Sequence, residues 1–328
     1  MSPATSLDEL IHRADLDGLV RWIDSLTSAQ DWEGLLQARD RARHAVHTGR
    51  QLWPAATLAE YRLALWAPAE WAAKVLDEES GRFSIGPLTE VAAQHHTYAD
   101  LAAVVPPGPK LGFVAHERAL RGEAIPAEAP NPLEIPFEVQ PWEPSYALAT
   151  YSDEGLDAPA PPLPPASSFR HVEIHRRAAT VDDTSVTLAV RQLFDTWTAA
   201  SNGRVDVVCV EGSAEMAVGA LGVRHPGLAE LPAANALAWL AWAGASGGAL
   251  GRRRGAATGR FATWWLLAAL GDVLDEWPVQ PGELHALADD LRWYWWDSGE
   301  PALGWAVQLA VEDPGEGYAW AISAHDAA

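Results

Sequence analysis

The sequence predicts an α+β protein with a helical N-terminal half of stacked helical hairpins. This half is packed on a C-terminal mixed α/β part with a short sheet and a closing β-hairpin. Apolar residues recur at spacings of three and four up to residue 122, whereas they alternate with polar residues after residue 170. The composition changes abruptly between these two patterns. We therefore expect a helical domain at 1–122, an acidic, proline-rich and partly ordered connector at 123–169, and a mixed α/β domain at 170–328.

The helical half begins with a recognisable N-terminal signal. Ser6 and Glu9 have the spacing of a capping box, in which each side chain satisfies a free backbone N–H of the first turn. The following apolar stripe, which includes Leu19 and Ile23, predicts one buried helix face. Further helices are expected up to Gly122, separated by proline and glycine residues.

The connector contains 11 of the 24 prolines, eight acidic residues and no basic residue. Its two proline pairs at 161–162 and 164–165 predict a local polyproline II conformation. The apolar residues of its first half predict that this half lies against a folded surface, while residues 153–168 bow outward. The proline run could serve as a ligand for a partner with an aromatic groove or form a stiff surface loop, and we favour the loop.

In the C-terminal part, we expect strands near 172–174 and 205–210, each followed by a helix, at 181–200 and 213–221. Such an order predicts two parallel strands joined by a right-handed crossover. Helices at 233–245 and 253–273 and one around Leu284 should follow. The alternating pattern around Asp313-Pro314-Gly315 predicts the closing hairpin.

Tryptophan is unusually frequent, with 17 residues in the chain, ten of them between 239 and 320. Trp293, Trp295 and Trp296 cannot all face one core if they lie on a helix, so at least one should be exposed or at a contact. An exposed indole offers a stacking surface for a sugar, a base or a partner side chain. Packing against the N-terminal helices is the interpretation that we favour.

The charge and cysteine content exclude several classes of protein. With 44 acidic and 23 basic residues the net charge is -21, which disfavours binding to nucleic acids or to anionic membrane surfaces. The single cysteine, Cys209, excludes an intramolecular disulfide and a multi-cysteine metal site. Because the N-terminus lacks a secretion signal and the apolar stretch 237–270 carries glycines and arginines, we expect a cytoplasmic protein that does not cross a membrane.

The most unusual stretch has six glycines and four arginines within residues 244–260. Free backbone N–H groups at a helix start and guanidinium groups both bind anions, so this segment is the best candidate for an anionic ligand. The candidate residues are Gly247, Gly248, Gly251, Arg252, Arg253, Arg254 and Arg260. A packing interpretation competes with this one, because Gly251, Gly255 and Gly259 recur every four residues and would form a smooth helix face for a neighbouring helix. We favour packing.

Two weaker groups could also carry chemistry. His171, Glu173 and His175 alternate along a predicted strand and are weak candidates for a metal site, although the spacing along a strand is long for three ligands of one ion. No metal is favoured. Asp183, Glu211 and Ser213 should lie at one edge of the predicted sheet, where α/β proteins bind ligands. Capping of the following helices is the simpler role for Asp183 and Ser213.

Four segments resemble an uncharacterised family of actinobacterial proteins of unknown function. They are Gly86-Pro-Leu-Thr-Glu-Val-Ala-Ala, His116-Glu-Arg-Ala-Leu-Arg-Gly-Glu, Ser246-Gly-Gly-Ala-Leu-Gly-Arg-Arg-Arg-Gly-Ala-Ala-Thr-Gly-Arg-Phe and the closing stretch around Glu312-Asp-Pro-Gly-Glu-Gly-Tyr-Ala-Trp. The resemblance spans most of the chain. It implies a cytoplasmic bacterial protein and brings no activity, cofactor or catalytic residue.

Two functional hypotheses follow. The first is a non-catalytic interaction or scaffold protein that recognises another protein through an acidic, tryptophan-bearing surface. The alternative is an enzyme or sensor that binds a small phosphorylated or carboxylated ligand at 247–260. The sequence specifies neither a cofactor nor a reaction.

Overall fold

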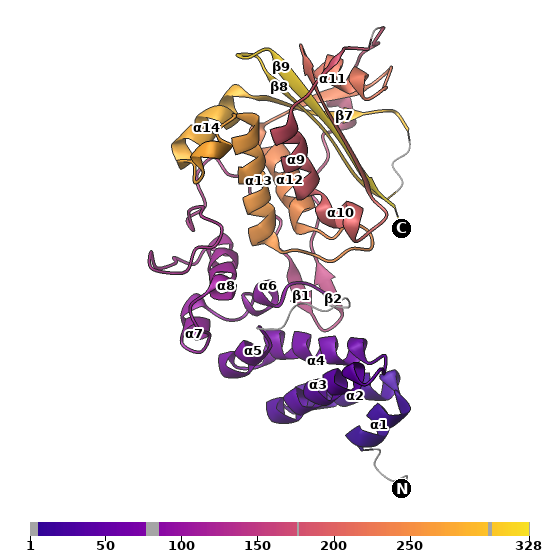
Figure 1. Cartoon of the computed structure of the whole chain (residues 1–328), viewed down its shortest axis with the longest axis vertical. Helices are drawn as coiled ribbons and strands as arrows, with labels where there is room; N and C mark the ends of the chain where they lie inside the picture. The colour runs from indigo at the N-terminus through magenta and orange to yellow at the C-terminus, as the bar shows by residue number, and fades with distance from the viewer. Residues whose placement is uncertain (1–5, 77–84, 176, 301–303, 328) are drawn as a thin grey trace. The chain divides into compact units, whose positions relative to one another are not determined.

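The computed structural model describes residues 6–76, 85–175, 177–300 and 304–327 (Figure 1). The chain divides into two compact units. Unit 1 comprises the described parts of 1–132 together with 149–157, and unit 2 comprises 133–148 together with the described parts of 158–328. Residues 123–169 are therefore divided between the two units. Helices dominate unit 1 and a sheet organises unit 2, which confirms the α+β class.

Unit 1 consists of helices and one small hairpin. Its elements are α1 (Leu7–Arg13), α2 (Leu16–Ser28), α3 (Trp32–His47), α4 (Trp53–Trp66), α5 (Ala69–Leu76), α6 (Leu88–Ala92), α7 (Tyr98–Ala102), α8 (Pro109–Leu120), β1 (Thr150–Ser152) and β2 (Gly155–Asp157). The expected capping box is present at the start of α1, where the Ser6 side chain accepts a hydrogen bond from the backbone N–H of Glu9. In the centre, the buried carboxylate of Glu60 on α4 forms ion pairs with Arg39 and Arg43 of α3. The buried face of the unit thus includes paired charges as well as apolar side chains.

Unit 2 contains one large sheet with helices on both faces. Its helical elements are η1 (Ala166–Ser168), α9 (Thr184–Leu193), α10 (Asp195–Ala199), α11 (Ala214–Ala220), α12 (Ala233–Ala245), α13 (Ala256–Leu270), η2 (Leu274–Glu276) and α14 (Pro281–Asp290). Its strands are β3 (Arg170–His171), β4 (Thr180–Val181), β5 (Arg204–Glu211), β6 (Gly227–Leu231), β7 (Arg292–Asp297), β8 (Trp305–Asp313) and β9 (Tyr318–Asp326). None of the helices in the described ranges is long and apolar enough to span a membrane.

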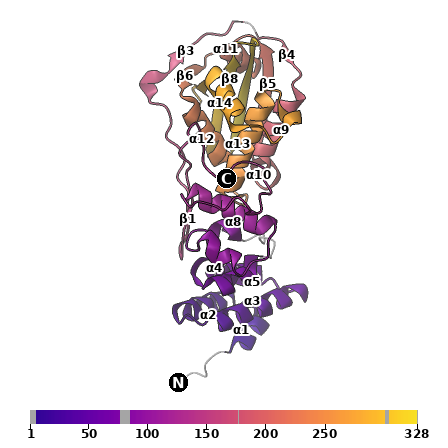
Figure 2. The same ribbon diagram turned by 90° about the vertical axis from the view of Figure 1, so that its left-hand side faces the viewer.

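The strand order is β3-β6-β7-β8-β9-β5-β4, and every neighbouring pair is antiparallel. The closing hairpin of β8 and β9 is confirmed. The predicted parallel pair, between the strand near 172–174 and β5, is wrong. β3 lies at one edge of the sheet, whereas β5 lies near the opposite edge, beside β4 (Figure 2), and pairs with β9 and β4 in antiparallel fashion. An alternating pattern identifies a strand but does not name its partner, and the partner of β5 comes from more than 100 residues later in the chain.

The tryptophans of β7 are all buried, although a helix would have left at least one of them exposed or at a contact. Trp293, Trp295 and Trp296 are at most 5% exposed. They lie on a strand and not on a helix, so successive side chains point to opposite faces of the sheet. Helix α12 covers one face and α11 covers the other (Figure 1), which gives both faces of β7 an apolar environment.

Candidate functional site

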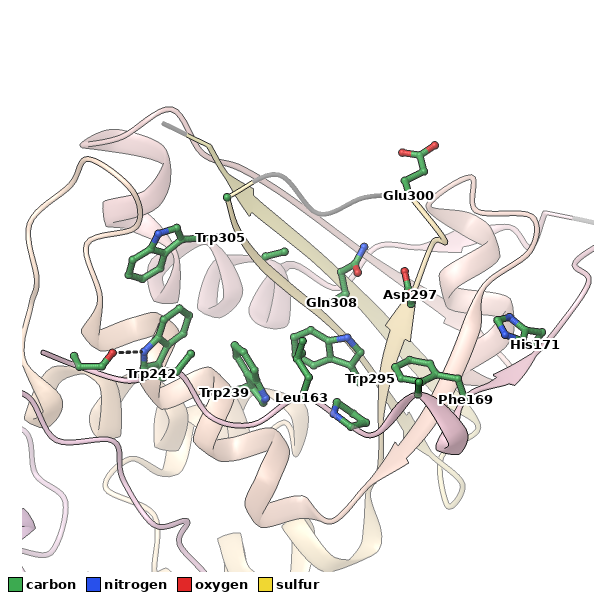
Figure 3. Close-up of a pocket in the computed structure, with 16 residues that line it drawn as sticks. Leu163, Phe169, His171, Trp239, Trp242, Trp295, Asp297, Glu300, Trp305 and Gln308 are labelled. Carbon is green, nitrogen blue, oxygen red and sulfur yellow. Dashed lines mark hydrogen bonds between the residues drawn. The ribbon is translucent and has the colours of Figure 1, made fainter.

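The candidate site is a cavity of about 770 Å³ in unit 2, at the place where β7 and β8 separate (Figure 3). The ladder between these strands runs from Arg292 to Trp295 on β7 and from Leu309 to Glu312 on β8. The first residues of β8, from Trp305 to Gln308, pair with β9 beyond that point. We call the cavity the tryptophan pocket; it is lined by Ala158, Ala160, Leu163, Pro164, Ala166, Phe169, His171, Trp239, Trp242, Trp295, Asp297, Glu300, Gly304, Trp305, Ala306 and Gln308.

Four indole rings form one wall of the pocket (Figure 3). Trp239 and Trp242 lie one turn apart on α12, so they project from the same helix face. Trp242 stacks on Trp305 with a centroid distance of 4.8 Å, and Trp239 contacts Trp295 at 4.7 Å. The fully buried Trp197 meets both Trp242 and Trp305 edge to face. Each ring is thereby fixed by its neighbours, and the wall is formed before any ligand arrives.

The opposite side of the pocket combines a stretch of proline-rich chain with a polar rim. Residues 158–166 supply apolar side chains along this side. The polar residues Asp297 and Gln308 lie beside Trp295, and Glu300 lies farther out at the edge of the pocket with its carboxylate directed away from the indoles (Figure 3). The described lining residues include no lysine or arginine. Gln308 lines the pocket and is 9% exposed. The pocket therefore offers aromatic surface together with acceptors for a donor or a cation.

The comparisons with known proteins identify the family. Residues 17–328 match the Family of unknown function (DUF6183). The chain belongs to this family. No curated protein and no solved structure is similar enough to this DUF6183 chain to count as a match. The resemblance inferred from the sequence to a family of unknown function is thereby confirmed.

In this DUF6183 protein, the glycine- and arginine-rich segment meets anions supplied by the chain itself. Arg260 on α13 is fully buried, and it donates to both carboxylate oxygens of Glu143, at 2.6 and 2.7 Å. Its remaining hydrogen bonds go to the backbone carbonyls of residues 136–138. The prediction that Arg260 contacts an external anion is therefore corrected, because its donors are already used within the fold.

The glycine loop contacts a second internal carboxylate. The backbone N–H of Ala249 donates to Asp326 at 2.6 Å, and the Ser201 hydroxyl donates to the other oxygen of Asp326. A Cβ atom on Gly248 would lie 2.1 Å from this carboxylate, and the residue has a φ of +68°. The N–H of Ala249 in this loop thus binds a carboxylate that belongs to β9 of the same chain.

The remaining residues of this segment divide between packing and an untested role. A Cβ on Gly259 would lie 2.1 Å from the carbonyl oxygen of Ala241, so the packing interpretation holds at this glycine, where α13 meets α12. Gly251 and Gly247 approach each other closely within the loop. Arg254 donates to the carbonyl of Gln192 at 3.1 Å, and burial lowers its pKa. An anionic ligand at the exposed Arg252, the buried Arg253 and Arg254 stays a prediction.

The predicted sheet-edge group is only partly assembled. Asp183 caps α9 by accepting from the N–H of Val186, and its second oxygen accepts from the Trp320 indole at 2.8 Å. Ser213 stands at the N-cap position of α11 but donates to Glu215, while Glu312 accepts from the first N–H of that helix. Glu211 is exposed at the end of β5. Capping is thus confirmed for Asp183 and is indirect at Ser213.

A second cavity, of about 790 Å³, lies beside Asp183 and includes Cys209. Burial, together with the nearby Asp183 carboxylate, raises the pKa of the Cys209 thiol to about 11. A thiol with such a pKa is almost entirely protonated near pH 7, and it is therefore a poor nucleophile. The Cys209 thiol therefore does not make this second cavity a better candidate site than the tryptophan pocket, whose aromatic wall is already formed.

The weak metal candidates do not form a metal site. His175 and Glu173 are exposed and 3.8 Å apart, and His171 lines the tryptophan pocket instead. Among the described residues, no group of three or more His, Cys, Asp or Glu side chains could hold a metal ion.

Sequence reasoning missed the tryptophan pocket because its residues come from four separate segments. The available signal was the excess of tryptophan after residue 239, and the sequence interpretation assigned most of these residues to the core. The assignment to the core is confirmed for Trp239, Trp242 and Trp295, which are buried. What the sequence did not show is that the proline-rich stretch at 158–165 lies opposite Trp239 and Trp242.

Proposed function

We propose that this protein is a non-catalytic interaction protein and that it recognises a cationic segment of a partner protein in the tryptophan pocket. The observation that carries the proposal is the wall of four fixed indoles next to a rim with two carboxylates. Tryptophan is the residue most enriched among those that dominate binding energy at interfaces.

The wall favours tight binding for a physical reason. Ring contacts on several sides hold Trp242 and Trp305 in place, so a ligand does not have to immobilise them. Ordering a flexible side chain on binding costs roughly 0.5–1.5 kcal/mol, and a preformed wall avoids that cost. The pocket volume of about 770 Å³ suits a short peptide segment or one large side chain with its neighbours.

The negative charges near the pocket favour a positively charged ligand. Asp297 and Glu300 stand at the rim, and the chain as a whole carries a net charge of -21. A lysine or arginine side chain placed between the rim and an indole face would gain both ion pairing and a cation–π contact, the latter worth about 0.5–2 kcal/mol. The net negative charge also speeds the encounter with a cationic partner at low ionic strength.

A peptide array tests the proposal. Immobilised nine-residue peptides with a central arginine or lysine are compared with the same peptides carrying glutamate, and those that bind are measured by calorimetry with the full chain. We expect the cationic set to bind and the acidic set to fail. Trp305→Ala should weaken binding by roughly 30-fold, since truncation of a central interface tryptophan costs about 2 kcal/mol or more.

Two further variants make the test specific. Asp297→Asn should weaken binding a few-fold at low salt and flatten its salt dependence, because exposed charge pairs are screened. Trp66→Ala removes a partly exposed indole from unit 1 and should leave binding unchanged. Equal binding of cationic and acidic peptides, or full binding by Trp305→Ala, would contradict the proposed function.

A further inference from the structure

The proline-rich stretch opposite the indoles has a conformation that its own sequence fixes. We call residues 158–165, Ala-Pro-Ala-Pro-Pro-Leu-Pro-Pro, the strap. Every residue of the strap is a proline or is followed by one. Proline fixes its own φ near −65°, and the residue before a proline avoids the helical region. The strap is therefore confined to extended, polyproline II-like backbone, and Pro165 has φ −63° and ψ 144°.

The strap lies against the tryptophan wall through its backbone carbonyls. The indole N–H of Trp242 donates to the carbonyl of Ala158 at 3.3 Å (Figure 3), and that of Trp239 donates to the carbonyl of Pro162 at 3.4 Å. Polyproline II backbone has no internal hydrogen bonds, so its carbonyls are available to such donors. Aromatic grooves that recognise proline-rich ligands use this property of the preformed, low-entropy helix.

The contacts that hold the strap are few. Both indole hydrogen bonds are long, and the side chain of Leu163 is 61% exposed. Most other strap residues are exposed as well. Exposed segments with few hydrogen bonds belong to the less stable parts of a fold, which can open locally without unfolding the rest.

We propose that the tryptophan wall is a polyproline II recognition site that the strap occupies in cis, and that a proline-rich segment of a partner protein, followed by a basic residue, replaces it. This inference rests on the proposed function and names the chemistry of the partner. The strap itself shows the backbone type that fits the indole donors. The acidic rim explains why the partner segment should end in a basic residue. Asp297 lines the pocket together with Leu163 and Pro164 in the second half of the strap and with Phe169 just after it. A basic residue that follows the prolines would therefore lie close to the Asp297 carboxylate.

A tethered ligand competes strongly with a free one. A short linker gives the strap an effective concentration in the millimolar range. The apparent affinity for a partner is then the intrinsic affinity multiplied by the fraction of molecules whose site is free. Release of the strap should therefore increase the apparent affinity for a proline-rich ligand. A partner with an additional basic contact has an advantage that the strap lacks, because the strap contains no charged residue.

The experiment uses the full chain with its strap prolines replaced, Pro159→Ser, Pro161→Ser, Pro162→Ser, Pro164→Ser and Pro165→Ser. The probe is the peptide Ala-Pro-Ala-Pro-Pro-Leu-Pro-Pro-Arg, and binding is followed by calorimetry and tryptophan fluorescence. We expect the variant to bind the peptide at least ten-fold more tightly than the wild-type chain does. Replacing the peptide's prolines by alanine should abolish binding, and ending it in glutamate should weaken it several-fold at low salt.

Two donor variants test the mode of binding. In the strap-substituted chain, Trp239→Phe and Trp242→Phe keep an aromatic surface but remove the indole N–H groups, and we expect each to weaken binding of the peptide. If the variant with all five proline substitutions does not fold, the milder variant with only Pro161→Ala and Pro162→Ala replaces it. Unfolding of the milder variant would also overturn the inference, because a displaceable segment is not needed for folding.

Two results separate this inference from the proposed function. If basic peptides bind in a Trp305-dependent manner whether or not they contain proline, the polyproline inference fails and the proposed function stands. If a folded strap variant binds neither the proline-rich peptide nor any other cationic peptide, both fail.

Discussion

Two pieces of the same acidic, proline-rich stretch are held in unit 2 by contacts of different strength. Residues 133–148 are fixed by a buried ion pair between Glu143 and Arg260, whereas the strap at 158–165 is exposed and held by two long indole hydrogen bonds. Both pieces are rich in proline. The difference lies in the side chains between the prolines, because the first piece carries a carboxylate that the core requires and the strap carries no charge.

The network around Glu143 shows how strongly the first piece is held. Its carboxylate accepts hydrogen bonds from Arg260, Trp264, Tyr146 and the backbone N–H of Gln140. Burial alone would raise the pKa of this carboxyl, but the hydrogen bonds and the charge of Arg260 hold it below its usual value. The comparison teaches that proline content sets the backbone conformation, and the polar partners decide whether a segment is part of the core.

The largest expected effect comes from breaking the ion pair. Arg260→Ala leaves the Glu143 carboxylate buried without its charge partner, which should lower the free energy of unfolding by about 3–5 kcal/mol. Urea denaturation of the full chain measures this loss. Arg204→Ala is the matched control, because its ion pair with Asp206 is solvent-exposed and its removal should change stability little. A small loss for Arg260→Ala would show that this segment is no better anchored than the strap.

The next largest loss of stability is expected where helices α12 and α13 pack against each other. Helix α13 carries Arg260, and α12 carries the indoles that contact the strap. Gly259→Ala inserts a methyl group where the backbone of α12 is 2.1 Å from the new Cβ, and such overpacking should lower stability by roughly 1–3 kcal/mol. Gly282→Ala, at a position with nothing within 4 Å, serves as the control and should not destabilise the chain. Equal effects of both substitutions would contradict the close approach of α12 and α13.

A pH series sharpens the comparison further. Since the pKa of Glu143 is lower in the folded chain than in the unfolded one, its contribution to stability is complete above the unfolded value of about 4.3. This contribution is lost as the pH falls through the folded pKa. We expect the wild-type free energy of unfolding to fall more steeply below pH 4.3 than that of Glu143→Gln, measured by urea denaturation. Parallel curves for the two proteins would contradict the role of Glu143.

The contacts that hold the strap should not change over the same pH series. The strap contains no titratable group, and both of its hydrogen-bond donors are indoles that do not ionise.

The sequence predicted the individual elements better than their partners. Helix α12 has the predicted bounds Ala233–Ala245, and the hairpin of β8 and β9 is where the alternation placed it. Local periodicity determines such elements. Strand pairing depends on contacts between distant residues, and for this reason the sheet was taken to contain a parallel pair although it is antiparallel.

The candidate site shows the same division. The sequence offered residues 247–260 as a candidate for an anionic ligand and favoured helix packing as their role. In the structure, Arg260 and the N–H of Ala249 contact the carboxylates of Glu143 and Asp326 from the same chain. Glu143 lies 117 residues before Arg260 and Asp326 lies 77 residues after Ala249, so neither contact could be predicted from the local sequence pattern. The proline run was predicted to be a stiff surface loop with local polyproline II conformation, in preference to a ligand for an aromatic groove. In the structure, two indoles of the same chain donate hydrogen bonds to its carbonyls.

The most direct measurement of the central claim is the unfolding free energy of the strap-substituted chain, determined beside that of Arg260→Ala and combined with the peptide titration. The account predicts that the strap variant loses less stability than Arg260→Ala and gains affinity for the proline-rich peptide, its loss coming mainly from the greater freedom of the unfolded chain without the five prolines. A strap variant that loses as much stability as Arg260→Ala and gains no affinity would show that the strap is a structural part of unit 2 and not a bound ligand.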